Sequence, residues 1–206
     1  MTLHVLGHPL ANKILMDLRD KNTPATRFRE LGKQLTYFLL IEATRGLKTK
    51  PKNIETPRAN FDDTDLGQSL VVVPILGAGL IMLQPAIDIL QDVSIRYIGM
   101  ERDETTALAR TYCCKLPNLN NKFVVVVDPM LATGSLAELA LETVLQQNPS
   151  DVVMVSIIAA PEGVRHLENL FPDIPIYTAA VDERLDEHKF VFPGLEDFGN
   201  RAYDTN

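Results

Sequence analysis

The sequence predicts an α/β fold in which helices cover both faces of a parallel sheet. Five apolar runs rich in valine and isoleucine occur at residues 70–76, 93–99, 122–127, 152–159 and 174–180. Helical patterns fill three of the intervals between them, at 79–91, 135–147 and 162–170. Continuous apolar strands joined by helical crossovers are typical of a parallel sheet that is buried on both faces.

Ahead of these runs, the chain predicts one long helix and then a loop. Thr23 has the character of an N-cap, Pro24 suits the first helical position, and apolar residues at helical spacing follow them. We therefore expect a helix over residues 24–47. Residues 48–65 are polar and contain two prolines, which predicts a loop or an irregular segment.

Two later segments depart from the strand–helix alternation. Residues 100–121 are polar and then read TYCCKLP, which suits an excursion or a hairpin. From Asp182 onward the chain has no strong period and carries many Gly, Asp and Pro residues. We expect this tail to form an ordered lid or a site-forming segment; frayed ends are the alternative that the sequence also allows. The whole of residues 1–206 is expected to be one domain, because its length matches that of a single globular unit.

Composition excludes several classes of partner. The net charge of −7 and pI of about 5.1 disfavour duplex nucleic acid, since neutralising phosphates requires basic surface. The N-terminus lacks the pattern of a signal peptide, and the longest apolar run, 70–83, is broken by proline and glycine and is too short to cross a bilayer. Cys113 and Cys114 are adjacent and are poorly placed to bridge. We therefore expect a reduced, cytoplasmic protein.

The stretch FVVVVDPMLATGS at 123–135 is the strongest local signal. Asp128 stands at the end of an apolar strand, and ligands of open α/β sheets bind beyond the carboxyl ends of the strands. The turn 132–135 then precedes a helix, where free N–H groups, the helix dipole and the hydroxyls of Thr133 and Ser135 suit a phosphate. Asp128 would be repelled by phosphate, so it suits sugar hydroxyls or developing positive charge. The alternative is a plain helix cap after a strand.

Other signals are weaker. Gly77-Ala78-Gly79 follows a strand, but Met82 stands where a dinucleotide-binding motif requires Gly or Ala, so a tight strand–helix turn is the favoured explanation. The four histidines show no spacing typical of metal ligands, so no metal site is predicted and surface or capping roles are expected. Arg102 follows a strand and would point into the same crevice as Asp128, although a solvated charge explains it equally.

Nine motifs taken together resemble the uracil phosphoribosyltransferase family. They are HPL (8–10), RFRE (27–30), VPILGAGL (73–80), ERD (101–103), KLP (115–117), VVDPMLATG (126–134), AAPEGV (159–164), IYTAAVDERLDEH (176–188) and FPGLEDFGNR (192–201). The resemblance is collinear and covers nearly the whole chain. It implies a type I phosphoribosyltransferase fold with a projecting hairpin and a C-terminal hood at about 182–206. It also implies that uracil and 5-phosphoribosyl 1-diphosphate (PRPP) give UMP and diphosphate, with Mg²⁺ bound through the donor.

The resemblance also implies the roles of individual residues. Asp128 and Arg102 are the catalytic candidates, with Arg102 on the diphosphate side. The implied donor-binding residues are Arg102, Asp128, Pro129, Met130, Leu131, Ala132, Thr133, Gly134, Ser135, Leu136 and Asp197. The implied uracil-binding residues are Val191, Glu196, Asp197 and Phe198, where backbone groups read the base edge.

The chain departs from the family pattern at both ends of this site. Gly77 stands where the family has an arginine for the diphosphate, and losing such a contact would cost about 2–5 kcal/mol. The other departures are Ser135 for Gly, Leu136 for Ser, Glu196 for Gly, Phe198 for Ala and Asn200 for Asp.

These departures leave three hypotheses. A uracil phosphoribosyltransferase is favoured; a weak or inactive regulatory relative and a phosphoribosyltransferase for another base are the alternatives. The resemblance implies a homodimer or a larger homo-oligomer, with the N-terminal helix contributing to it. The sequence leaves open whether a nucleotide such as GTP acts as an effector.

Overall fold

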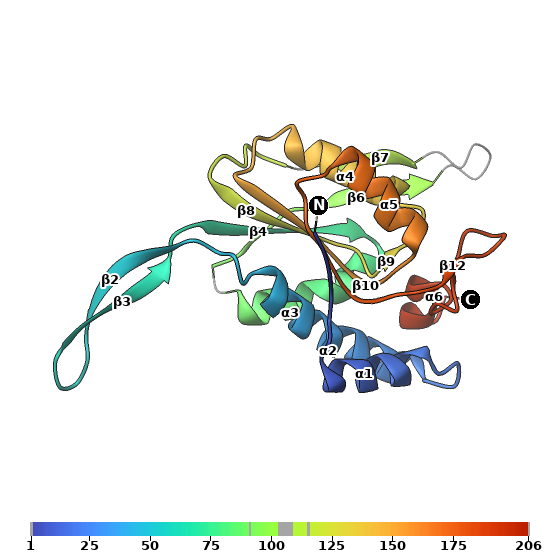
Figure 1. Ribbon diagram of the computed structural model, residues 1–206, viewed down its shortest axis with the longest axis horizontal. Coiled ribbons are helices and arrows are strands. Elements are labelled where there is room, and N and C mark those ends of the chain that lie inside the picture. Colours follow the sequence, from blue (N-terminus) through green and yellow to red (C-terminus); the bar gives the residue numbers. More distant parts are fainter. Residues whose placement is uncertain (1, 91, 103–108, 115, 206) are drawn as a thin grey trace.

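The computed structural model of the chain describes residues 2–90, 92–102, 109–114 and 116–205. Of these residues, it describes only the backbone of those within 100–115. Its centre is one large sheet in the order β1-β11-β10-β8-β4-β6-β7 (Figure 1). The strands of this path are β1 (Leu3–Val5), β4 (Ser69–Leu76), β6 (Ile98–Arg102), β7 (Ala109–Cys114), β8 (Lys122–Val127), β10 (Asp151–Ala159) and β11 (Ile176–Val181). Short strands β5 (Ser94–Ile95) and β9 (Met130–Leu131) pair beside β4 and β10.

Every pairing in this sheet is parallel except that of β6 with β7. The predicted parallel sheet is therefore confirmed. The apolar run predicted at 93–99 contributes two strands rather than one. The hairpin expected within 100–121 is formed by β6 and β7, and its tip, 103–108, lies outside the described residues.

Helices cover both faces of the sheet, as the continuous valine runs require. In β8 the fully buried side chains of Val124 and Val126 pack in one core and those of Val125 and Val127 in the other. Figure 1 shows α4 (Ser135–Leu145) and α5 (Pro161–Leu170) above the sheet. Helices α1 (Pro9–Arg19), α2 (Ala25–Ala43) and α3 (Leu83–Ile89) lie below it, with the 3₁₀ turn η1 (Ala78–Met82) leading into α3. No described helix is long and apolar enough to cross a membrane.

The N-terminal helical region differs from its prediction in three respects. The long helix ends at Ala43 rather than at residue 47. The long helix is present as α2, but Pro24 is its N-cap, while the Thr23 hydroxyl donates to the carbonyl of Asp17, 2.7 Å away. A further helix, α1, precedes it, and the Nδ1 of its N-cap His8 accepts from the N–H of Leu10 at 3.2 Å. The capping role expected for one histidine is thus found at His8.

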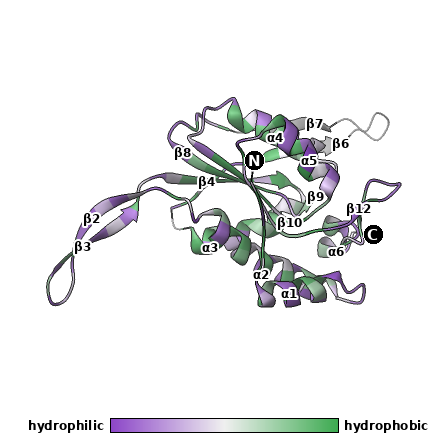
Figure 2. Ribbon diagram, viewed as in Figure 1, coloured by the Kyte–Doolittle hydropathy of each residue, from purple (hydrophilic) through white to green (hydrophobic). Residues whose placement is uncertain are grey.

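Residues 48–65 form a hairpin, so the loop prediction was wrong. Strands β2 (Thr49–Glu55) and β3 (Asn60–Leu66) pair along their whole length and project away from the sheet (Figure 1). Figure 2 shows hydrophilic residues along this hairpin. Polar pairs such as Asn53 with Asp62, 2.6 Å apart, replace the apolar alternation from which a strand is normally recognised.

The tail from Asp182 is ordered and lies at the end of the sheet toward which β4 points (Figure 1). It contains β12 (Arg184–Leu185), β13 (Val191–Phe192) and α6 (Phe198–Tyr203). We call residues 182–205 the hood. Two arginines of the N-terminal helices anchor it: Arg19 bonds the Asp182 carboxylate at 2.9 and 2.5 Å, and Arg29 bonds the carbonyl of Ala202 at 2.6 Å.

Candidate functional site

The turn between β8 and α4 surrounds a small pocket of about 30 Å³. Its lining residues are Asp128, Met130, Leu131, Ala132, Thr133, Gly134, Leu136 and Ala137. Seven of these were predicted donor-site residues, so the structure gathers most of that set around one cavity. Pro129, another of the set, is buried, and its carbonyl accepts from the N–H groups of Ile157 and Ile158 at 3.0 and 3.1 Å. Pro129 therefore ties the turn to β10.

Gly134 sets the shape of this turn. Its φ is +90°, a left-handed conformation that favours glycine. A Cβ at this position would lie 2.9 Å from Cδ2 of His166 and 3.3 Å from the carbonyl oxygen of Gly163. The turn is therefore packed closely on α5, and any side chain at Gly134 would push the two apart.

The turn presents hydroxyl and N–H donors at the N-terminus of α4. The Thr133 and Ser135 hydroxyls lie 2.9 Å apart, and the N–H of Ser135 approaches the Thr133 hydroxyl at 3.4 Å. Gly134 is the N-cap of the helix, and no side chain caps it. An eleven-residue helix that begins in this way offers N–H groups and a positive dipole end to an anion.

Asp128 lies beside this turn with its charge partly suppressed. Burial raises the pKa of its carboxyl to about 7, against a smaller lowering by the hydrogen bond from the N–H of Met130. Its own N–H donates to the carbonyl of Val155 at 3.1 Å, which fixes the residue at the edge of β10. A partly buried carboxylate of this kind is stabilised in its ionised form by an arriving positive charge.

The turn at Gly77 and Gly79 is the tight strand–helix turn that was predicted, and it leaves room for a side chain at Gly77. A Cβ at Gly79 would lie 2.9 Å from the carbonyl oxygen of Val127, so Gly79 permits the tight strand–helix turn that the sequence indicated. A Cβ at Gly77 would meet no described atom within 4 Å. The position where the family has an arginine is thus open to a side chain.

Arg102 is placed only through its backbone. It ends β6 and pairs with Ala109 of β7. Its side chain lies outside the described part of the chain, so its role on the diphosphate side stays a prediction.

The hood residues take different directions. Val191 is buried, and the backbone at Gly194, with φ +63°, turns back so tightly that a Cβ there would lie 1.9 Å from the Val191 carbonyl oxygen. Asp197 caps α6 by accepting from the N–H of Asn200 at 2.7 Å. Glu196 is exposed and has a φ of +62°. A positive φ explains why glycine is usual at this place in the family pattern.

The Phe198 ring points into the core. It is 2% exposed, and its centroid lies 4.8 Å from that of Phe28 on α2. Any contact that this residue makes with a base therefore comes from its backbone, and the ring does not stack on the base.

The ion pair that holds the hood was missed by sequence reasoning. The Asp182 side chain is 4% exposed, accepts from both terminal nitrogens of Arg19 and also accepts from the N–H of Gly194 at 2.9 Å. Arg19 donates in addition to the carbonyl of Gly194 at 2.9 Å. The partners lie 163 residues apart, so no local pattern joins them, although Asp182 directly follows β11 within one of the family motifs.

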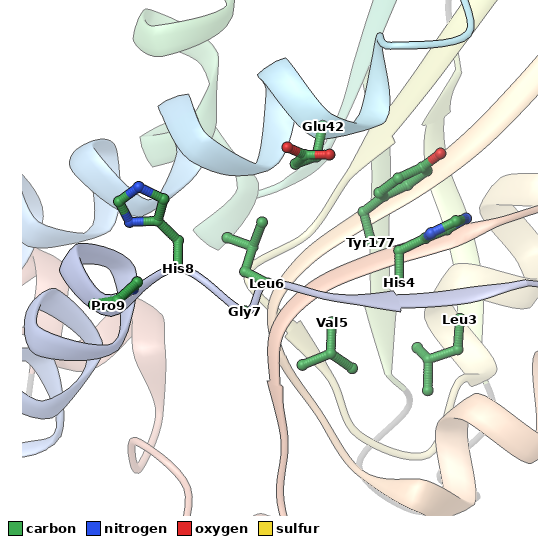
Figure 3. Close-up of a pocket in the computed structure, with 9 residues that line it drawn as sticks. All are labelled: Leu3, His4, Val5, Leu6, Gly7, His8, Pro9, Glu42 and Tyr177. Carbon is green, nitrogen blue, oxygen red and sulfur yellow. The ribbon is translucent and has the colours of Figure 1, made fainter.

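A larger cavity, of about 540 Å³, lies elsewhere and contains none of the predicted site residues. Figure 3 shows it along β1, with His4 and Tyr177 side by side and Glu42 facing the same space. The His4 and Tyr177 rings are stacked, with centroids 4.4 Å apart. Among the described residues, no group of three or more acidic, histidine or cysteine side chains is placed to hold a metal ion.

Comparisons with known proteins agree along the whole chain. The model of a family described as uracil phosphoribosyltransferase matches residues 5–205. A uracil phosphoribosyltransferase of Dictyoglomus thermophilum is 42% identical over 203 residues, covering 98% of each chain. One from Campylobacter concisus is 38% identical over 202 residues, covering 98% of this chain and 97% of the relative.

Solved structures give the same result at the level of the fold. A protein of Aquifex aeolicus superposes with a TM-score of 0.95 at 35% identity, covering 100% of this chain and 99% of its own. A hypoxanthine-guanine phosphoribosyltransferase from Bacillus anthracis superposes with a TM-score of 0.52 at 13% identity, covering 76% of this chain and 80% of its own. At that identity the second likeness concerns the fold alone, which is the type I phosphoribosyltransferase fold.

Proposed function

The chain belongs to the uracil phosphoribosyltransferase family, and we propose that the turn 132–136 and the hood are its donor and base sites. The reaction moves the phosphoribosyl group of PRPP to uracil and gives UMP and diphosphate. One observation carries the assignment of the donor site. Gly134 holds a left-handed turn at the N-terminus of α4, within a pocket that Asp128 also lines.

In this proposal the turn binds the 5-phosphate of the donor. The phosphate accepts from the N–H groups at the start of α4 and from the hydroxyls of Thr133 and Ser135. Leu136, where the family has serine, offers no hydroxyl, so the two remaining hydroxyls carry the side-chain contribution. The two hydroxyls lie 2.9 Å apart, on the first residue of α4 and on the residue two positions before it, which supports this assignment.

Asp128 serves the sugar. The bond from C1 of the ribose to diphosphate breaks as the bond to N1 of uracil forms, and positive charge develops on the ribose. A partly buried carboxylate at this point stabilises that charge or holds the ribose hydroxyls. Because its pKa of about 7 is raised by burial, positive charge nearby shifts it toward the ionised form.

The same chemistry fits a magnesium ion that arrives on the donor. Mg²⁺ commonly keeps several waters and binds through substrate phosphates and one or two carboxylates. Asp128 and Asp197 are the acidic side chains of the proposed site that would face it, directly or through water. When bound, the ion would neutralise charge on the leaving diphosphate.

The hood is proposed to read uracil with its backbone. The segment around Val191 and 196–198 supplies N–H and carbonyl groups to the base edge. The buried ring of Phe198 and the exposed side chain of Glu196 both leave this edge to the backbone. That arrangement favours uracil over a base selected by a carboxylate, which was one of the alternatives left open by the sequence.

The assembly is proposed to be a homodimer or a larger homo-oligomer. The β2–β3 hairpin projects from the sheet and exposes Ile54, Phe61 and Leu66, which are 42%, 51% and 43% accessible. Isolated two-stranded hairpins are marginally stable in water, so a second copy of the chain is a suitable cover for these side chains.

We also propose a cytoplasmic location, which the expected reduced state of the adjacent cysteines supports. Adding GTP to the assay below tests whether it is an effector.

The experiment is a product assay with matched glycine variants. The protein is incubated with PRPP, Mg²⁺ and uracil, cytosine, hypoxanthine or guanine in turn, and mononucleotides are separated and quantified. Uracil alone should yield product. Gly134→Val should abolish binding of PRPP and UMP, because the side chain forces the turn away from α5. Gly46→Ala, at a position with no described atom within 4 Å of the added Cβ, is the control.

Two results would contradict the proposal. Equal nucleotide affinity in Gly134→Val and the wild type would show that the 5-phosphate does not bind at the turn. If the wild type forms product from an amino-bearing base and Glu196→Gly does not, the Glu196 carboxylate selects the base and the assignment of uracil is wrong.

A further inference from the structure

Behind the phosphate turn lies an interaction between two helices. The Nε2 of His166 on α5 lies 2.6 Å from Oε2 of Glu138 on α4. Because an ionised carboxylate only accepts, the imidazole donates this hydrogen bond. Both side chains are partly exposed, His166 by 39% and Glu138 by 31%. The pair therefore spans the two helices at the edge of the proposed donor site.

The pair is close to the turn itself. Cδ2 of His166, the ring atom bonded to Nε2, is the atom that a Cβ at Gly134 would meet at 2.9 Å. This approach depends on Gly163, where a Cβ would lie 2.3 Å from the carbonyl oxygen of Ala132. Glycine at 163 thus lets α5 reach the turn and brings the imidazole against it.

Glu138 poses an electrostatic problem for the donor. It lies in the first turn of α4, and its N–H donates to the carbonyl of Gly134 at 2.8 Å. A carboxylate there interacts favourably with the helix dipole in the empty protein. It has the same sign of charge as a phosphate bound at the same helix end. The two anions would repel each other, and both would interact with the same helix dipole.

We propose that His166 is a positioning residue for the phosphoribosyl donor. It holds the Glu138 carboxylate in a hydrogen bond, while its ring supports the backbone of the turn at Gly134. The 5-phosphate can then bind at a helix end that already carries an acidic side chain. This inference rests on the proposed function, because it assigns the 5-phosphate to the turn 132–136.

The test is a double-mutant cycle with His166→Gln and Glu138→Gln, measured by steady-state kinetics for PRPP and for uracil. His166→Gln should raise the KM for PRPP about five- to thirtyfold and leave kcat and the KM for uracil within about twofold. Glu138→Gln alone should leave the KM for PRPP unchanged or lower it. The double variant should return this KM to within about threefold of the wild type, because the repelling charge is gone. His4→Gln, on β1 and outside the site, is the control for loss of a histidine.

Ribose 5-phosphate gives a second readout that does not depend on turnover. Its affinity, measured by calorimetry, should fall in His166→Gln and recover in the double variant. A double variant as impaired as His166→Gln would overturn the inference, since a purely structural role of the ring predicts that result. An unchanged KM for PRPP in His166→Gln would also overturn it.

These failures differ from failure of the proposed function. If the phosphate does not bind at the turn, Gly134→Val will bind PRPP as well as the wild type does. If only the role of His166 is mistaken, Gly134→Val will still lose PRPP, while the cycle shows no recovery.

Discussion

Replacing Asp128 by asparagine should stabilise the ligand-free protein at alkaline pH while it removes activity. Asparagine keeps the shape of the side chain and cannot ionise. In the wild type, burial raises the pKa of this carboxyl from its ordinary value of 3.8 to about 7. The folded state therefore holds the proton more tightly than the unfolded state does. Stability contributed by the neutral form is complete below pH 4 and is lost as the pH rises through 7.

The size of the effect follows from the difference between the two pKa values. That difference is about three pH units, and each unit corresponds to 1.36 kcal/mol, so ionised Asp128 costs roughly 4 kcal/mol at pH 8. At pH 5 the cost is roughly 1.6 kcal/mol, because the unfolded carboxyl is already ionised there. The advantage of Asp128→Asn over the wild type should therefore grow by roughly 2–3 kcal/mol between pH 5 and pH 8.

Urea unfolding of both proteins at pH 5 and pH 8, at one protein concentration and without ligand, measures this growth directly. Product formation from PRPP and uracil, measured in parallel, should be lost in Asp128→Asn at both pH values. An advantage that stays constant within about 0.5 kcal/mol across this range would show that the carboxyl is not held neutral by burial, and the reasoning would fail.

Three further changes follow from the same structure. Gly77→Arg places a cation in open space and should lower the KM for PRPP roughly tenfold, whereas Gly77→Gln should not; equal effects would mean that another cation already serves the diphosphate. Glu196→Gly relieves a positive φ and should raise the free energy of unfolding by about 0.5–1 kcal/mol with uracil still preferred, and a loss of stability would contradict the conformational argument. Arg19→Ala leaves Asp182 buried without its partner and should cost about 3 kcal/mol and raise the KM for uracil. Arg45→Ala, which breaks an exposed pair with Glu42, should cost under about 1 kcal/mol, and a similar loss in both variants would refute the special role of the hood anchor.

The sheet and the phosphate turn were predictable because their signals are local. Strands that are buried on both faces are continuous runs of valine and isoleucine, and such runs do not occur in exposed segments. The turn after Asp128 joins a strand end to a helix start within a few residues, so a short window of sequence contains its whole signal. Pro24 also marked the start of the long helix. The helix begins at Ala25, one residue later than predicted, because Pro24 and not Thr23 is the N-cap.

The remaining features depend on partners that are distant in sequence or on polar pairing. The hairpin at 48–65 is held by cross-strand polar pairs, which resemble a loop when only hydrophobicity is considered. The direction of the Phe198 ring depends on Phe28, and the contact between His166 and Gly134 depends on how closely α5 approaches α4. Such distances are fixed only when the helices pack.

The position of β1 has a consequence for how the chain is made. β1 leaves the ribosome long before β11, which is its only neighbour in the described sheet, with Leu3 opposite Ile176. Arg19 likewise meets Asp182 only after most of the chain has been synthesised. β1 must therefore wait for β11 before it can pair in the sheet, since distant pairings close late. Helix α1 can pack earlier on α2, which directly follows it, although its contact through Arg19 also waits. A nascent chain stalled before residue 176 should keep its N-terminal strand open to proteases and chaperones until synthesis resumes.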